Sequence, residues 1–156
     1  MTGSNQSEDR HSRNWCELSL HAGGRSLIEA SAGTGKTWTI SVLYLRLLLE
    51  NAFSAKQIVV TTFTDAAAQE LRERIRGRLL WADALLCGII ENSPNELKSN
   101  TVGLDELWLR NRWCVLGARD VVCQRRAHQD LNRLRLAQVD LDHAPIGTLH
   151  SICRKV

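Results

Sequence analysis

The sequence lacks three features that would assign it to a special class of protein. Its five cysteines, at positions 16, 87, 114, 123 and 153, contain no C-x-x-C pair, so neither a zinc site nor a disulfide framework is indicated. No apolar run approaches the length of a membrane span, and no signal peptide is recognisable. The net charge of +3 is too small to indicate a nucleic-acid-binding protein by itself. These absences predict a soluble protein of the reducing cytoplasm.

Length and composition favour one folded domain. The chain has 156 residues, of which 44% are apolar, and this is ample for one buried core but too little for two full domains. Residues 1–14 are polar, charged and aperiodic, which is typical of a disordered tail, and no function is predicted for them. The sequence contains no internal repeat.

One stretch, Ser26–Thr39, has the pattern of a strand, a phosphate-binding loop and a helix. A short apolar run predicts a strand over Ser26–Ala30, small residues follow, and an apolar helix is predicted over Lys36–Glu50. The loop differs from the usual G-x-x-x-x-G-K-[ST] pattern only at Ala30, where a residue nearly as small replaces glycine. The other interpretation, a glycine-bearing turn with a chance Gly-Lys-Thr, is disfavoured because the strand and helix patterns flank the loop.

The residue types in this loop suit a polyphosphate. Gly33 and Gly35 let the main chain approach the phosphates closely, and the positive end of the following helix dipole points at them. Lys36 adds a mobile cation, and the hydroxyl of Thr37 can bind Mg²⁺. The predicted nucleotide-binding residues are Ala30, Ser31, Ala32, Gly33, Thr34, Gly35, Lys36 and Thr37, with Thr37 as the metal ligand.

The next segments continue an α/β pattern. Gln57–Thr62 is β-branched and apolar, which predicts a strand buried on both faces, and hence parallel to the first strand in a right-handed βαβ unit. A helix is predicted from about residue 65 to 90, capped by Thr64 or Asp65. Its buried stripe is predicted to consist of Leu71, Ile75, Leu79 and Ala82.

The remaining chain predicts helices and a final short strand. A loop over residues 92–103 precedes a helix beginning near Asp105 and another from about residue 119 to 138. A short strand then turns into a helix over Pro145–Cys153. Four arginines of this region favour a solvated helix face over a phosphate-contacting stripe: Arg125, Arg126, Arg133 and Arg135. Two tryptophans, Trp108 and Trp113, favour core packing over stacking on a ligand.

Three stretches together resemble a known family. They are LIEASAGTGKT (residues 27–37), IVVTTFTDAAAQEL (residues 58–71) and GTLHSIC (residues 147–153). In sequence, order and spacing they are similar to the first three helicase motifs of superfamily 1 DNA helicases of the UvrD/RecB group, and most of all to RecB-like helicases, the beta-subunit type of exodeoxyribonuclease V. Glu29 before the loop and the T-F-T-D-A-A-A run are much more specific than a phosphate loop alone.

The resemblance implies an incomplete RecA-like P-loop NTPase domain with parallel strands, and ATP-driven movement along DNA. It also implies ATP and Mg²⁺ as cofactors, and single-stranded DNA or DNA ends and RecC/RecD-like subunits as partners. Phe63, Thr64, Thr148 and His150 would be the DNA-binding residues, with the ring of Phe63 available for a base to stack on. Without the resemblance, Phe63 is better interpreted as a core aromatic, and His150 as a capping or buried histidine.

The implied domain organisation has four parts. Residues 1–14 are the tail, 15–91 the P-loop βαβ core of the first helicase domain, 92–143 a helical insertion, and 144–156 a truncated return to the core. His21 stands where the family usually has a glutamine that reads adenine. An ATPase also needs an acidic pair after a second apolar strand, and the one candidate, Leu136–Asp140, is a poor match.

We therefore expect an amino-terminal helicase fragment, of marginal stability and without ATPase activity of its own, because the acidic pair, the arginine finger and the nuclease domain are missing. Such a fragment would act, as part of a RecB-type enzyme, in DNA recombination and double-strand-break repair. The alternative is a non-catalytic nucleotide-binding or subunit-docking module left by a truncated gene. A small P-loop kinase is disfavoured because no substrate lid is visible.

Overall fold

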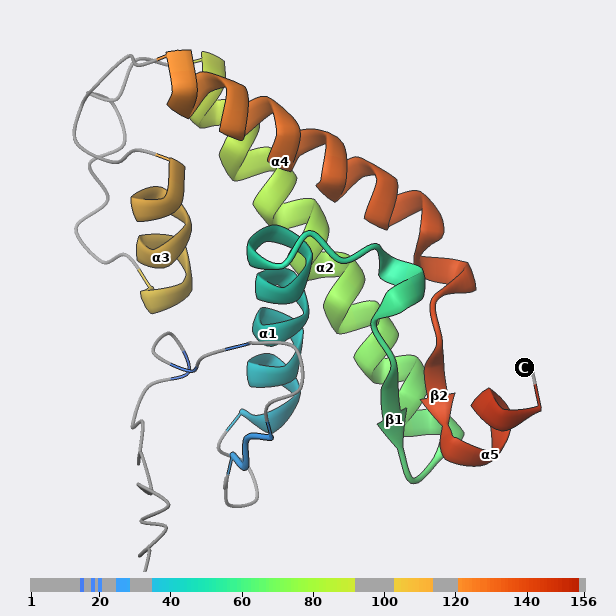
Figure 1. The fold of residues 1–156 in the computed structure, drawn as a ribbon. Coiled ribbons are helices and arrows are strands. Elements are labelled where there is room, and N and C mark those ends of the chain that lie inside the picture. Colours follow the sequence, from blue (N-terminus) through green and yellow to red (C-terminus); the bar gives the residue numbers. More distant parts are fainter. Residues whose placement is uncertain are drawn as a thin grey trace, which may run out of the picture.

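Two long helices, α2 (Asp65–Glu91) and α4 (Val121–Asp140), lie side by side and run in opposite directions through most of the fold (Figure 1). Helix α1 (Lys36–Glu50) packs against both, and the shorter α3 (Leu104–Trp113) lies beside α4 and α2. The computed structural model describes residues 15, 18, 20, 25–28, 35–91, 103–113 and 121–154. Within these ranges no helix is long and apolar enough to cross a membrane.

The sheet of the described residues consists of two short parallel strands, β1 (Val60–Thr62) and β2 (Ile146–Thr148). Val60 pairs with Ile146 and Thr62 with Thr148, so both strands end at the same level. The 3-10 turns η2 (Ala55–Gln57) and η4 (Leu141–His143) lead into the strands, and β2 continues directly into α5 (Leu149–Cys153). The sheet thus joins two segments that α2, α3 and α4 separate in the sequence.

The core confirms the predicted helix faces. Helix α1 has the predicted bounds, and the stripe predicted for α2 is buried at Leu71, Ile75, Leu79 and Ala82. Trp113 of α3 is 4% exposed, as expected of core packing, and the side chain of Trp108 is half-buried. On α4, Arg125 and Arg126 are exposed, which agrees with a solvated face.

Two expectations for strands are wrong. The strand predicted over Ser26–Ala30 is absent from the described part of that segment, residues 26–28, where Leu27 is 83% exposed. This part has no partner strand among the described residues, and an unpaired extended segment cannot form a ladder. The second strand is shorter than predicted and is not buried on both faces: Val59 is 60% exposed, because α2 packs against the sheet and leaves Val59 uncovered.

Two arginines of α2 hold η4 and the start of β2 in place. Arg72 donates hydrogen bonds to the backbone oxygens of Leu141, at 2.6 Å, and Ile146, at 2.8 Å. One turn later, Arg76 forms an ion pair with Asp142 at 2.6 Å, and its hydrogen bond holds the pKa of Asp142 below the ordinary value. These contacts join α2 to η4 and to the first residue of β2, and so set the position of the start of this strand.

A buried carboxylate joins α3 to α4. Asp130 is fully buried and accepts hydrogen bonds from Arg112 at 2.7 Å, from Arg133 at 3.0 Å and from the indole nitrogen of Trp113 at 2.9 Å. Arg112 also donates to the backbone oxygen of Leu49 at the end of α1, at 2.6 Å. The cluster therefore connects three helices through one charged group.

Candidate functional site

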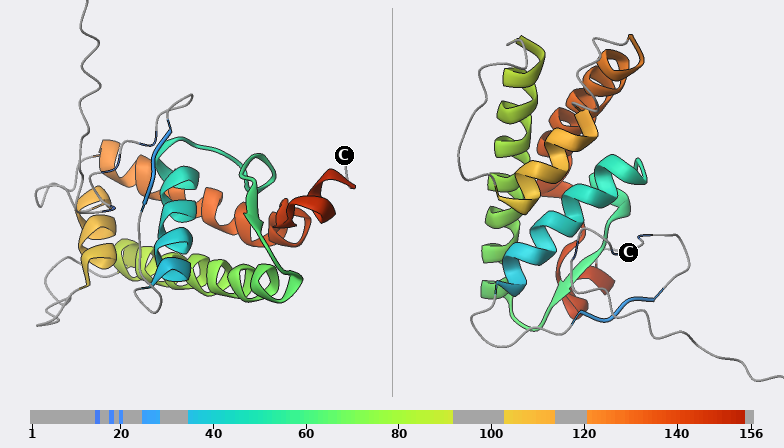
Figure 2. Two further views of the ribbon diagram at one scale, coloured as in Figure 1. Left: turned by 90° about the horizontal axis from the view of Figure 1, so that it is seen from below. Right: turned by 90° about the vertical axis from the view of Figure 1, so that its left-hand side faces the viewer.

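The three motif stretches approach one end of the fold. Figure 1 shows the first turn of α1 and the carboxyl ends of β1 and β2 at the lower end of the molecule, and the right-hand view of Figure 2 agrees. This end also holds the start of α2, which follows β1, and α5, which follows β2. Segments far apart in the sequence thus lie at the same end of the fold.

The start of α1 suits an anion. Gly35 precedes the helix with φ of 87°, a left-handed backbone that favours glycine, and as the N-cap residue it has no side chain with which to cap the first turn. The first N–H groups of a helix have no acceptor within it, so they are available to a ligand. Lys36 is exposed and Thr37 is half-buried in this turn. These residues fit the phosphates and Mg²⁺ of a nucleotide; Glu29, the loop residues Ala30–Thr34 and His21 lie outside the described residues.

At the end of β1, a polar turn presents an aromatic ring. Thr62 donates to the backbone oxygen of Thr64 at 2.9 Å, and the hydroxyl of Thr64 accepts a hydrogen bond from the N–H of Ala67 at 3.2 Å. Thr64 is thus the cap of α2, one of the two residues predicted for this role. Phe63, between the two threonines, is fully exposed, so its interpretation as a core aromatic is wrong.

At the end of β2, Thr148 connects the two loops. Its hydroxyl caps α5 by accepting from the N–H of Ser151 at 3.3 Å, and it lies 3.4 Å from a carboxylate oxygen of Asp65 at the start of α2. His150 is exposed, so it is neither buried nor the cap of this helix. The four residues predicted to bind DNA therefore lie at the adjacent ends of two paired strands.

Gly147 is required by the packing of this loop. A Cβ at this position would come within 2.5 Å of the hydroxyl oxygen of Ser151, which is itself held by a 2.8 Å hydrogen bond to the backbone oxygen of Thr148. We expect Gly147→Ala to lower the free energy of unfolding by about 0.5–1.5 kcal/mol, because the hydroxyl of Ser151 must turn away and lose its hydrogen bond to Thr148. Urea denaturation measures this loss. Gly88→Ala, where a Cβ meets nothing within 4 Å, is the control, and an equal loss in both variants would contradict this role of Gly147.

The segment considered for the acidic pair is not a strand. Leu136–Asp140 forms the last turns of α4, and Asp140 pairs with Lys56 at 2.9 Å. Within the described ranges, no group of three or more His, Cys, Asp and Glu side chains is placed to hold a metal ion. The described residues therefore offer Thr37 as a magnesium ligand without an acidic cluster beside it.

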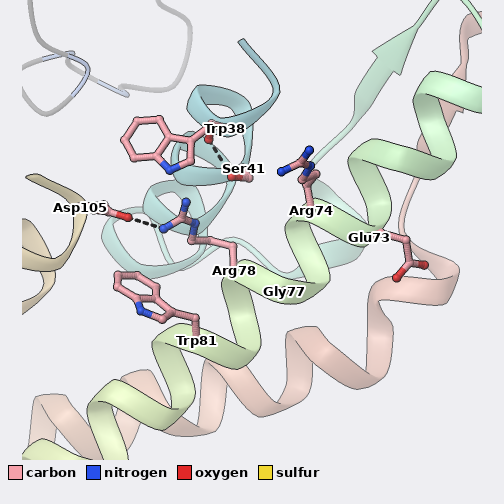
Figure 3. A pocket seen from close by; sticks show the side chains of 8 residues that line it. All are labelled: Trp38, Ser41, Glu73, Arg74, Gly77, Arg78, Trp81 and Asp105. Carbon is pink, nitrogen blue, oxygen red and sulfur yellow. Dashed lines mark hydrogen bonds and ion pairs between the residues drawn. The ribbon is translucent and has the colours of Figure 1, made fainter. Parts of the chain in front are cut away.

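A second feature near the start of α1 was not predicted. A hollow of about 440 Å³ lies between α1, α2 and α3 (Figure 3). It is lined by Trp38, Ser41, Glu73, Arg74, Gly77, Arg78, Trp81 and Asp105. Trp38 directly follows Thr37, but no sequence motif links it to the other residues, which lie at least 35 positions later apart from Ser41. Only the packing of the three helices brings them together.

The chain belongs to the UvrD/REP helicase family: the family model of the UvrD/REP helicase N-terminal domain matches residues 14–156. Among curated proteins it is similar to RecB subunits of the RecBCD enzyme. The subunit of Haemophilus influenzae is 39% identical over 138 residues, which cover 84% of this chain and 10% of that protein. The subunit of Escherichia coli is 34% identical over 148 residues, which cover 89% of this chain and 11% of that protein.

A third relative has a higher sequence identity over a shorter stretch of this chain. The RecB subunit of Buchnera aphidicola is 59% identical over 61 residues, 34% of this chain and 5% of that protein. The chain thus spans about a tenth of the length of the first two relatives. The predicted resemblance to the amino-terminal part of RecB/UvrD-type helicases is confirmed.

Proposed function

We propose that this chain is the ATP-binding amino-terminal part of a RecB-type DNA helicase that acts in DNA recombination and double-strand-break repair. The observation that supports the proposal most is that the described parts of three motif stretches lie at one end of the fold: the first turn of α1, with glycine as its N-cap, and the ends of β1 and β2. Two such ends beside one anion-binding turn suit a protein that holds a nucleotide and a nucleic acid together.

In this proposal the start of α1 binds ATP, and the ends of β1 and β2 bind single-stranded DNA. The loop Ala30–Gly35 and the first N–H groups of α1 surround the phosphates, Lys36 pairs with them, and the Thr37 hydroxyl binds Mg²⁺. In the complete enzyme, hydrolysis of the ATP held here would supply the free energy for movement along DNA. Phe63 offers its exposed ring to a base of single-stranded DNA, and Thr64, Thr148 and His150 offer polar atoms beside it.

The chain alone is proposed to bind but not to turn over ATP, because no acidic pair follows a second apolar strand in its sequence. Residues 15–91 and 144–156 would form the P-loop core and residues 92–143 an inserted helical part. RecC/RecD-like subunits and DNA ends in the cytoplasm would be the partners of the assembled enzyme. A negligible rate of ATP hydrolysis, with or without single-stranded DNA, is the expected result for the purified chain.

Substitution of Lys36 tests the nucleotide site. Lys36→Ala removes the cation that pairs with the phosphates, and we expect MgATP affinity to fall by at least about tenfold, the loss typical of one charge-assisted hydrogen bond. Lys56→Ala, which removes an exposed lysine paired with Asp140 instead, is the matched control. Calorimetric titration of the purified 156-residue chain gives both affinities.

The outcomes separate the two functions that the sequence left open. Equal MgATP affinity in the Lys36→Ala variant and the parent chain would contradict the nucleotide site. MgATP binding without any binding of a single-stranded oligonucleotide would favour the non-catalytic nucleotide-binding or docking module over the helicase segment.

A further inference from the structure

One arginine lies between two tryptophan rings at the edge of the hollow. The guanidinium carbon of Arg78 is 5.3 Å from the ring centroid of Trp38 and 5.0 Å from that of Trp81, within the range of cation–π attraction (Figure 3). Arg78 lies on α2, and Trp38 lies in the first turn of α1, next to Thr37. Arg78 therefore contacts the nucleotide-binding end of α1 from the neighbouring helix.

A residue of α3 fixes this arginine. Asp105 forms an ion pair with Arg78, and the side chains are only 15% and 14% exposed. Gly103, just before α3, leaves the space that this carboxylate occupies, since a Cβ there would lie 2.6 Å from the Asp105 oxygen. A guanidinium that is stacked on both sides and paired at its tip has few other positions available.

The cluster extends further across the aromatic rings. Trp15 contacts Trp38 edge-on, with ring centroids 5.7 Å apart, and Trp108 of α3 lies 6.3 Å from Trp15. Four tryptophans and one ion pair thus connect α1, α2 and α3 on the side of the molecule where α1 begins. The nearby pair Glu106–Arg110 lies within α3 alone, and it provides a natural comparison.

We infer that Arg78 is a positioning residue: held by Asp105, it fixes Trp38 and with it the first turn of α1, so that α3 in the inserted helical part influences nucleotide affinity. This inference rests on the proposed nucleotide site at Lys36 and Thr37. By linkage, a partner that moves α3 changes the affinity of the chain for MgATP, and MgATP changes the affinity for that partner by the same factor.

The inference is tested by removing the charge of Asp105 while keeping the size and shape of its side chain. In the full chain, Asp105→Asn removes the charge that holds Arg78, and we expect MgATP affinity to fall about fivefold, the lower end of typical coupling between sites. Glu106→Gln, which removes the charge of the adjacent residue on the same helix, is expected to leave MgATP affinity unchanged. Thermal unfolding of both variants, followed by circular dichroism, separates a loss of affinity from a loss of stability.

A double-mutant cycle tests whether Asp105 acts on MgATP affinity through Trp38. In a Trp38→Leu background, Asp105→Asn is expected to cause no further loss, because the ring that Arg78 positions is absent. Arg78→Lys, which keeps the charge but loses the planar stacking group, is expected to reproduce the loss and replaces Asp105→Asn if that variant does not fold.

The results distinguish this inference from the proposed function. A parent chain that binds no MgATP would contradict the nucleotide site, and the inference with it. A parent chain that binds MgATP, with equal affinity in the Asp105→Asn and Glu106→Gln variants, would overturn the inference alone. It would also be overturned if the Asp105→Asn effect persisted in the Trp38→Leu background.

Discussion

Replacing Asp130 with alanine is expected to lower the free energy of unfolding by about 3–5 kcal/mol. The carboxylate is fully buried and accepts hydrogen bonds from Arg112, Arg133 and Trp113. Its removal leaves the Arg112 guanidinium, whose side chain is 18% exposed, without its counter-charge. A buried charge that loses its partner costs far more than the pair contributes when intact. Because Arg112 also holds the end of α1, the loss extends beyond the contact of α3 with α4.

Urea denaturation followed by circular dichroism measures this effect. The matched control is Asp140→Ala on the same helix, where the pair with Lys56 is exposed and its loss is expected to cost less than about 1 kcal/mol. Asp130→Asn keeps the size of the side chain and separates the lost charge from the cavity. If the Asp130→Ala and Asp140→Ala variants unfolded at the same urea concentration, the buried cluster would not have the structural role described here.

Replacing Phe63 with alanine is expected to weaken binding of a single-stranded oligonucleotide by about 1–3 kcal/mol without loss of stability. The ring is fully exposed, so its removal leaves no cavity. It follows the end of β1, and the β2 end with Thr148 and His150 lies alongside. In the proposed function this ring provides a stacking surface for a base, which an aliphatic or shorter side chain does not replace.

Fluorescence anisotropy with a labelled oligothymidylate, at one fixed salt concentration, gives the affinities. Phe63→Trp keeps a stacking ring and is expected to bind at least as well as the parent chain. Leu136→Ala, which shortens an exposed apolar side chain on α4, is the control for a general loss of apolar surface. Unchanged affinity in the Phe63→Ala variant would remove this residue from the proposed DNA-binding surface.

Local sequence signals predicted the helices and the final strand and helix of Pro145–Cys153 well, and the first two strands poorly. The bounds of α1 and the buried stripe of α2 follow from apolar periodicity, and the start of α2 follows from the Thr64 cap. Both signals depend on neighbouring residues alone. The strands depend on distant partners. Val59 has the composition of a buried strand residue, but the described helices leave it exposed. Ser26–Ile28 likewise has no partner strand among the described residues.

For the candidate site, residue types were informative only together with the motif pattern. Taken singly, Phe63 was better interpreted as a core aromatic and His150 as a helix-capping or buried histidine, yet both are exposed. The motif resemblance indicated the opposite. The contact between Trp38, Arg78 and Asp105 had no sequence signal, because it arises from the way in which three helices pack.

The pairing of β1 with β2 has a consequence for how the molecule folds. The two strands are adjacent in space, but the segment between them contains α2, α3 and α4. Bringing such distant segments together costs loop entropy that the local contacts of helices do not have to overcome. We therefore expect the helices to form early in synthesis and the end with Phe63 and Thr148 to assemble last, after β2 has left the ribosome. A nascent chain that has not reached this stage lacks the completed surface that we propose to bind DNA.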